Sequence, residues 1–142
     1  MSPKPPWLYR QSAVIPYRLA GDGIEVLLIT SARSGRWIIP KGVVEPDLTP
    51  VQSALKEAWE EAGVSGRVEP TAIGSYRYDK WGGTCTVTVF LLEVTTVATV
   101  WPESRLRRRR WFPITAAGDL VDQPGLRDLI RSLGARLGPG AG

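Results

Sequence analysis

One capped, amphipathic helix, expected over residues 49–63, constrains the fold of this chain more than any other segment. Thr49 is a suitable N-cap, Pro50 suits the first helical position because its missing N–H costs nothing there, and Gln52 completes a capping box. Gly63 is a natural stop for the helix. With about 100° of rotation per residue, the apolar side chains form one narrow stripe, made up of Val51, Ala54, Leu55, Ala58 and Ala62. We therefore expect this face to pack against a sheet.

Beside the stripe, three glutamates (Glu57, Glu60 and Glu61) form one acidic cluster. Positions three and four apart on a helix are neighbours, so these side chains share a sector of roughly 100°, directed away from Lys56. On a solvated face such a cluster costs only about a few tenths of a kcal/mol, so an ordinary wet surface is one interpretation. The other is a site for Mg²⁺ or Mn²⁺, because these hard cations prefer carboxylate, carbonyl and water oxygens. A divalent ion would in turn suit a pyrophosphate substrate, whose oxygens it neutralises.

The rest of the chain is mostly typical of strands. Apolar, β-branched segments recur at residues 12–19, 24–31, 36–39, 72–78, 84–94 and 108–113. The first two are joined by Ala-Gly-Asp-Gly, which predicts a hairpin. We expect a loop over 43–48, a C-terminal helix within 119–137 that starts or breaks near Pro124, and a disordered tail at about 138–142. Strands with a few helices favour an α/β or α+β sandwich with a mixed sheet.

Length and composition exclude several classes of protein. The chain has 142 residues, which predicts a single domain with a short flexible N-terminus, and no apolar run approaches the roughly 18 residues that span a bilayer. The N-terminal segment does not resemble a secretory signal, so we expect a cytoplasmic protein. Cys85 is the only cysteine and histidine is absent, so any metal must be held by oxygen. The net charge of +4 favours anionic partners, either a phosphate-bearing ligand or a nucleic acid.

The spacing of the glutamates resembles the signature of the Nudix hydrolases. That signature requires seven residues that this chain supplies within a 23-residue window, namely Gly42, Glu57, Ala58, Glu60, Glu61, Gly63 and Val64. The preceding segment GRWIIPKG is also similar to the family. The resemblance covers most of the chain and implies a Nudix-type α/β/α sandwich with a mixed central sheet, formed by a single domain over residues 1–142.

The resemblance also implies roles for individual residues. Glu57, Glu60 and Glu61 would be catalytic and would hold Mg²⁺ or Mn²⁺ with help from Gly42, and one glutamate would orient or deprotonate the attacking water. Family members often take a further acid or base from outside this segment, and the candidates here, which the sequence does not rank, are Asp79, Glu93 and Glu103. The activity implied is Mg²⁺-dependent hydrolysis of a small-molecule phosphoanhydride.

Two positions depart from the family pattern. Leu48 stands where the family has glutamate and Lys56 where it has arginine, so the ion pair that braces the preceding loop cannot form in its usual way. Lysine lacks the planar fork that grips a carboxylate at two points, and its substitute partner would be Asp47, Glu45 or Glu60. We expect an active but slower enzyme. The alternative is a catalytically impaired Nudix-like domain that binds a nucleotide or phosphorylated ligand.

Two further segments suggest a substrate. TSARSGRWIIPKGVVEP and RRRRWFPITAA are similar to the branch that hydrolyses diphosphoinositol polyphosphates and diadenosine polyphosphates. Arginine and lysine suit phosphate, so the predicted phosphate ligands are Arg10, Arg33, Arg36, Lys41 and Arg109. Only half of the 107–110 run can face one site on a strand, and a solvated edge is the alternative for that run.

The aromatic residues and the partners complete the sequence-based expectations. We expect Trp37, Trp111 and Phe112 in the core and Trp81, in a glycine-rich loop, stacked on a base. A nucleic-acid partner is disfavoured, because the chain has no recognition motif and its acidic helix opposes a polyanion. We expect no membrane partner and a monomer or homodimer.

Overall fold

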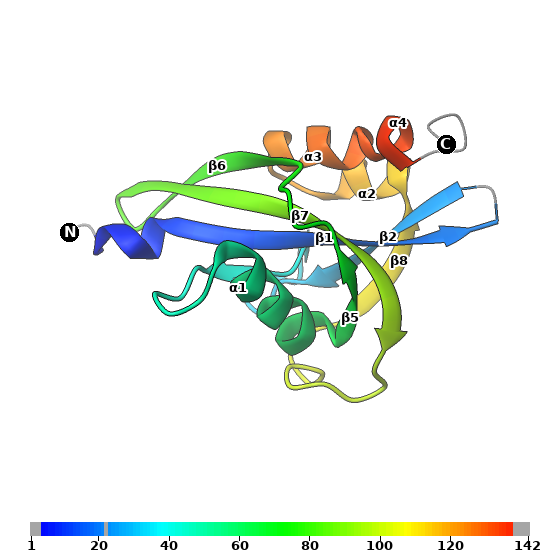
Figure 1. Ribbon diagram of the computed structural model, residues 1–142, viewed down its shortest axis with the longest axis horizontal. Coiled ribbons are helices and arrows are strands. Elements are labelled where there is room, and N and C mark those ends of the chain that lie inside the picture. Colours follow the sequence, from blue (N-terminus) through cyan, green and yellow to red (C-terminus); the bar gives the residue numbers. More distant parts are fainter. Residues whose placement is uncertain (1–3, 22, 138–142) are drawn as a thin grey trace.

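The computed structural model describes residues 4–21 and 23–137, in which an eight-stranded sheet lies between helices (Figure 1). The strands are β1 (Arg10–Ala20), β2 (Gly23–Thr30), β3 (Trp37–Ile38), β4 (Lys41–Val43), β5 (Val64–Val68), β6 (Gly74–Lys80), β7 (Gly83–Val97) and β8 (Arg109–Pro113). The helices are a 3₁₀ turn η1 (Pro6–Tyr9), α1 (Pro50–Glu57), a π-helical turn η2 (Ala58–Ala62), α2 (Ile114–Leu120), α3 (Pro124–Arg131) and α4 (Leu133–Leu137). The tail predicted at 138–142 lies outside the described residues.

The long strand β1 organises the sheet. Along Arg10 to Tyr17 it runs parallel to β7, whereas its last residues pair antiparallel with β2. Its start pairs antiparallel with β4, where Ser12 lies opposite Gly42. The sheet is therefore mixed, and the predicted α+β sandwich is confirmed.

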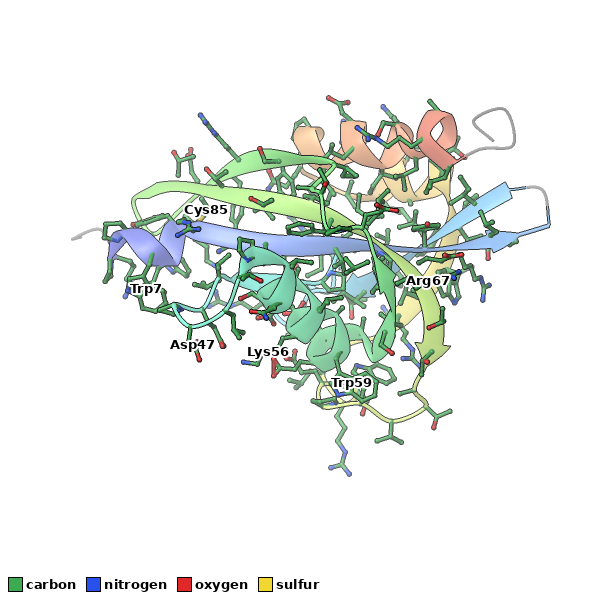
Figure 2. The ribbon with its side chains drawn as sticks, viewed as in Figure 1. Trp7, Asp47, Lys56, Trp59, Arg67 and Cys85 are labelled. Carbon is green, nitrogen blue, oxygen red and sulfur yellow. The ribbon has the colours of Figure 1, made fainter. Side chains whose placement is uncertain are left out.

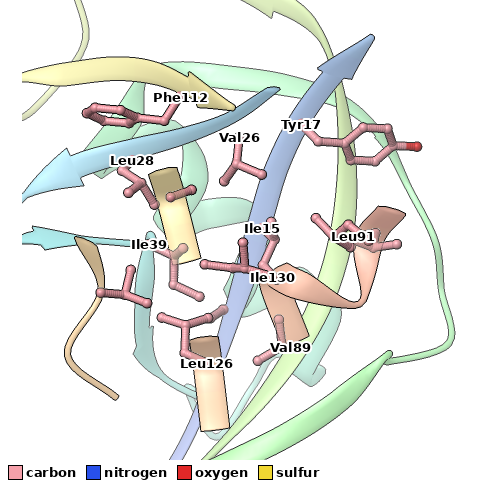
Figure 3. Close-up of a cluster of buried hydrophobic side chains, with 14 of the residues drawn as sticks. Ile15, Tyr17, Val26, Leu28, Ile39, Val89, Leu91, Phe112, Leu126 and Ile130 are labelled. Atoms are coloured by element: carbon pink, nitrogen blue, oxygen red, sulfur yellow. The ribbon is translucent and has the colours of Figure 1, made fainter. Parts of the chain in front are cut away.

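Helices cover both faces of the sheet (Figure 1). Helices α2, α3 and α4 cover one face, where Leu126 and Ile130 of α3 pack against strand residues that include Ile15, Leu28 and Val89 (Figure 3). Helix α1 covers the other face. The predicted core position of Phe112 is confirmed, and Trp37 and Trp111 are partly buried against the two clusters. No helix in the described part of the chain is long and apolar enough to cross a membrane.

The apolar stripe on α1 and η2 packs on the sheet as the sequence predicts. Ala54, Ala58 and Ala62 have no exposed surface, and they pack with buried strand residues that include Val14 and Phe90. The capping box forms, because the Thr49 hydroxyl accepts from the Gln52 N–H at 3.2 Å and the Gln52 side chain accepts from the Thr49 N–H at 2.9 Å. Gly63 ends the helix in the left-handed region, with φ of 66°.

The sequence did not predict every element. Strand β4 was not predicted, and its last residue, Val43, is the first residue of the loop expected over 43–48; β5 and α2 were not predicted either. Three residues are too few to show a period, so β4 exists because β1 supplies its hydrogen bonds. Helix α2 follows Pro113 with no side-chain cap, so it carries no start signal. Helix α3 begins at Pro124, as one of the two predicted alternatives requires.

The alanine face of α1 leads to a stability prediction. Ala54→Leu should lower the free energy of unfolding by about 1–3 kcal/mol, because the added carbons have no space between the helix and the sheet. Urea unfolding followed by circular dichroism measures the change. Ala135→Leu on the exposed side of α4 is the matched control and should have little effect. Equal stabilities for the two variants would contradict this account of the packing.

Candidate active site

Glu61 is the most deeply buried acidic residue of the candidate site, with 8% of its surface exposed. One carboxylate oxygen accepts from the backbone N–H of Lys41 at 3.1 Å, and the other lies 3.4 Å from a guanidinium nitrogen of Arg107. The backbone of β4 on one side and Arg107 on the other thus hold this carboxylate in place.

Glu57 lies directly over Gly42. A Cβ atom placed on Gly42 would be 2.2 Å from the Glu57 carboxylate, so a larger residue at position 42 would displace that side chain. Only glycine lets the Glu57 carboxylate approach the backbone this closely, which is a physical reason for a glycine at this sequence spacing from the glutamates.

Burial shapes the protonation of both carboxyls. Burial and, to a smaller extent, the neighbouring charge of Glu60 raise the pKa of Glu57 to about 7. Burial also raises the pKa of Glu61 to about 8, although Arg107 and the Lys41 N–H act in the opposite direction. These two acids therefore bind protons more tightly than ordinary glutamates in the absence of a counter-ion.

Glu60 differs from the other two glutamates because its side chain is 36% exposed. Its carboxylate lies 3.9 Å from the Lys56 ammonium. The expectation that the whole cluster points away from Lys56 is therefore wrong, since residues four apart lie on the same side of a helix.

Lys56 takes Glu45 as its partner, at 2.6 Å. Glu45 was one of the three partners considered, and its backbone N–H also donates to the Ser53 hydroxyl, which ties the loop to α1. Figure 2 shows Lys56 and Asp47 on the open side of α1 and its preceding loop, away from the sheet. Because both charges of the Lys56–Glu45 pair are more than a third exposed, solvent screens their attraction and the pair contributes little to stability.

A cavity of about 300 Å³ opens beside Glu61. It brings together five of the residues predicted from the sequence, Arg33, Lys41, Gly42, Glu61 and Trp81. Gln11, Lys80 and Arg107 also line it. Several cations next to buried carboxylates suit an anionic ligand accompanied by a metal ion.

Lys41 lies between this cavity and a smaller one of about 140 Å³. Its ammonium donates to the Tyr78 hydroxyl at 2.8 Å and to the Gln11 side chain at 3.3 Å, and burial lowers the pKa of Lys41. The Tyr78 hydroxyl in turn donates to Gln11 at 2.7 Å. The sequence did not indicate Gln11 and Tyr78, because no local pattern connects two residues that lie 67 positions apart on different strands.

Trp81 stands at the tip of the β6–β7 hairpin. It adopts a left-handed backbone conformation, with φ of 56°, and its carbonyl accepts from the Tyr9 hydroxyl at 2.6 Å. The N-terminal turn η1 thereby holds this wall of the larger cavity.

The other predicted phosphate ligands lie elsewhere. Arg36 pairs with Asp122 at 2.8 Å and lines the smaller cavity, and Arg10 is exposed at the start of β1 without lining either cavity. Arg109 requires a correction, because its guanidinium donates to the Ala62 carbonyl at 2.7 Å and is therefore occupied by the protein backbone. Arg107 takes the place at the cavity that Arg109 was expected to fill.

The three candidates for an additional acid are separated by the structure. Glu103 accepts from Arg107 at 2.8 Å and so adjoins the glutamate cluster. Glu93 pairs with Arg67 between β5 and β7, and Asp79 accepts from Thr84 near the hairpin tip. Glu103 is thus the one connected to the site.

The donor chemistry of the site suits a hard divalent cation, because every candidate ligand is an oxygen. Glu57, Glu60 and Glu61 would hold the ion, with Gly42 as the predicted carbonyl ligand. Across residues 4–21 and 23–137, however, no three acidic, histidine or cysteine side chains already surround one metal position.

Comparisons with known proteins bear on this site. The family model described as "NUDIX domain" matches residues 8–133. Nudix hydrolase 21, chloroplastic, of Arabidopsis thaliana is 34% identical over 131 residues, covering 87% of this chain and 66% of its own length. Nudix hydrolase 13, mitochondrial, of the same plant is 34% identical over 146 residues, covering 84% of this chain and 72% of its own length. The chain thus spans about two thirds of the length of these curated relatives.

Two further comparisons concern other relatives. Diphosphoinositol polyphosphate phosphohydrolase 3-alpha of Mus musculus is 38% identical over 96 residues, which cover 66% of this chain and 57% of that protein. The structure of a Caenorhabditis elegans Ap4A hydrolase binary complex superposes with a TM-score of 0.78 at 23% identity, covering 90% of this chain and 96% of that one. At this identity the superposition shows the fold alone.

The raised pKa values lead to a prediction about pH and metal. Because the folded pKa values of Glu57 and Glu61 (about 7 and about 8) exceed the ordinary 4.5, the metal-free protein should lose stability as pH rises from about 4.5 to about 8. Mg²⁺ favours the ionised carboxylates, so it should raise the melting temperature more at about pH 8.5 than at about pH 6. Differential scanning fluorimetry measures both effects.

Glu61→Gln should weaken this dependence on pH and metal, whereas Glu69→Gln, at an exposed position, should preserve it. A stabilisation by Mg²⁺ that is the same at both pH values would show that these carboxyls do not titrate with metal binding.

Proposed function

Because this chain belongs to the Nudix hydrolase family, we propose that it hydrolyses a phosphoanhydride bond of a small molecule, with Mg²⁺ or Mn²⁺ as cofactor. One observation carries the proposal: Lys41, Arg107 and the buried carboxylate of Glu61 line the same cavity, next to Glu57 over Gly42. Nudix hydrolases in general use divalent metal ions, which agrees with the all-oxygen donor set.

The residues of the cavity would have different roles in such a reaction. When bound, a divalent cation supplies positive charge to the phosphate oxygens and lowers the pKa of water. Arg33, Lys41 and Arg107 bind and orient the phosphate chain, and arginine forks match its oxygens at two points. A glutamate of the cluster accepts the proton from the attacking water, a task that a pKa near neutrality suits.

The favoured substrate is a nucleoside diphosphate linked to another group, with dinucleoside polyphosphates or diphosphoinositol polyphosphates as the leading classes. The number of cations around the cavity supports a substrate with several phosphates. The relative from mouse is named for diphosphoinositol polyphosphate, and the structure from Caenorhabditis elegans for Ap4A. Trp81 offers a ring on which a base can stack.

A catalytically impaired binding domain is the second candidate. It is favoured by the acidic side chains, which do not already surround one metal position in the described residues, and by the exposed Lys56–Glu45 pair in place of the family's brace. Metal-dependent release of phosphate separates the two functions. A cytoplasmic location and a monomeric or homodimeric state remain predictions from the sequence, and the two plant relatives carry organelle names.

The proposed activity predicts the outcome of a substrate panel. With Mg²⁺ or Mn²⁺, the protein should hydrolyse diadenosine polyphosphates or diphosphoinositol polyphosphates. Glu60→Gln should lower kcat by about 100-fold, because it removes a metal ligand and even changes to the partners of metal ligands cost about 10- to 100-fold. Glu69→Gln is the control for loss of an acidic residue. No turnover on any pyrophosphate, or turnover unchanged in Glu60→Gln, would refute the catalytic assignment.

Trp81 generates a second prediction. If it stacks on a base, Trp81→Ala should raise KM for a diadenosine polyphosphate by roughly 10-fold, since stacking contributes about 1–3 kcal/mol per base. Inhibition by inorganic tripolyphosphate, which has no base, should be unchanged. Trp81→Phe should restore most of the affinity, and Trp7→Ala tests for a general effect of losing an exposed tryptophan. Equal losses for both ligands would mean that Trp81 shapes the cavity without reading a base.

A further inference from the structure

We propose that Trp101 and Arg109 are positioning residues that set the orientation of Glu60 and Glu61 by holding the end of the catalytic helix. The proposal rests on the assignment of these glutamates under the proposed function. It concerns the segment of residues 98–108, which joins β7 to β8 and passes beneath the C-terminal end of η2 (Figure 1), together with Arg109 at the start of β8. We call Trp101, Glu103 and Arg109 the helix clamp.

The clamp donates hydrogen bonds to three successive backbone carbonyls at the end of η2. The last carbonyls of a helix have no partner within it and need one from elsewhere. Here the Glu60 carbonyl accepts from the Glu103 backbone N–H at 3.0 Å. The Glu61 carbonyl accepts from the indole N–H of Trp101 at 3.0 Å, and the Ala62 carbonyl accepts from Arg109 at 2.7 Å. Two of these three carbonyls belong to predicted metal-binding glutamates.

Arg109 and Trp101 also hold each other. The guanidinium carbon lies 3.8 Å from the centre of the Trp101 ring, and a second guanidinium nitrogen donates to the Ala98 carbonyl. Arg109 therefore ties the helix end to the start of the same segment. Gly63 leaves the space for this arrangement, because a Cβ atom there would lie 2.7 Å from Trp101 and 2.8 Å from Arg109.

The same segment also reaches the side chain of Glu61. Arg107 is held by Glu103 at 2.8 Å and by the Thr30 carbonyl at 3.1 Å, and it lies 3.4 Å from the Glu61 carboxylate. Glu61 is therefore contacted at its carbonyl by Trp101 and at its carboxylate by Arg107. A shift of the clamp would move both ends of this residue together.

The π-helical geometry gives the clamp its importance for the site. Helix α1 is regular up to Glu57, and the wider turn η2 covers residues 58–62, the stretch that carries Glu60 and Glu61. Single π-helical turns inside α-helices are rare and recur at functional sites. A relaxation of η2 to a regular α-turn would rotate Glu60 and Glu61 relative to Glu57, which stays in α1.

The alternative is that the clamp only stabilises the fold. Such a role would lower the melting temperature without changing the affinity for metal at temperatures where the protein is folded. Positioning residues instead change metal binding and kcat in the folded protein, and typically by about 10- to 100-fold when they act through a metal ligand. The two roles are separated by measuring both properties on the same variants.

The test uses the full chain with Arg109→Gln, Arg109→Lys and Trp101→Phe. Trp101→Phe keeps the ring but removes the indole donor, and Arg109→Lys keeps the charge but loses the planar fork. Arg110→Gln is the matched control, since Arg110 lies on the opposite face of β8, 5.2 Å from the Phe112 ring. Mn²⁺ affinity is measured without substrate by electron paramagnetic resonance. The kcat, the KM and the melting temperature of the same variants are then measured.

We expect Arg109→Gln to lower Mn²⁺ affinity and kcat by about 10- to 100-fold with KM for the phosphoanhydride nearly unchanged. Trp101→Phe should show a smaller loss in the same two quantities, Arg109→Lys should recover little, and Arg110→Gln should match the wild type. If Arg109→Gln does not fold, Trp101→Phe and Arg109→Lys still decide the matter.

The outcomes also separate this inference from the proposed function. Variants with a lower melting temperature but wild-type Mn²⁺ affinity and kcat would overturn the clamp alone. A wild-type chain that binds Mn²⁺ but hydrolyses nothing would refute the proposed activity, while the Mn²⁺ titrations still test the clamp. A wild-type chain that binds no Mn²⁺ would overturn both.

Discussion

The close packing of the alanine face of α1 and η2 on the sheet is the contact on which the candidate site depends. Ala54, Ala58 and Ala62 have no exposed surface, and their small side chains allow the helix to approach the strands closely. This approach places the Glu57 carboxylate over Gly42 and the Glu61 carboxylate against the Lys41 N–H. A helix with larger residues on that face would stand further from the sheet, and both carboxylates would lose their contact with β4.

The same proximity creates an electrostatic problem that the surrounding residues only partly solve. Burying a carboxylate is unfavourable unless it is paired and hydrogen-bonded. Glu61 has Arg107 and a backbone N–H, yet its pKa is still raised to about 8, and that of Glu57 is raised to about 7. Glu57 and Glu61 therefore lose their protons less readily than ordinary glutamates, and Glu61 lines a cavity together with Arg33, Lys41 and Arg107. A divalent cation bound beside these carboxylates would relieve the crowding of negative charge.

Much of the fold and part of the site could be predicted because their signals are local. The capping box, the alanine stripe and Gly63 all lie within one helix, and each was found where the spacing placed it. Arg109 was wrongly expected at the phosphate because alternation along a strand indicates only a face. Arg107 lies in the loop before β8 and reaches the cavity, whereas Arg109, the first residue of the strand, reaches the helix end. Gln11 and Tyr78 could not be found, because their contact with Lys41 requires three strands to be placed first.

The sequence by itself determined the family, the mixed sheet with helices and the glutamates that share one helix, because these depend on short-range spacing and on residue chemistry. The tertiary structure alone decided which carboxylates are buried, which arginine faces them and which cation braces the loop. These properties arise from residues far apart in the chain, such as Lys41 and Glu61, Thr30 and Arg107, or Trp101 and the carbonyl of Glu61. Burial and pairing depend on distance in space, and no periodicity along the chain encodes that distance.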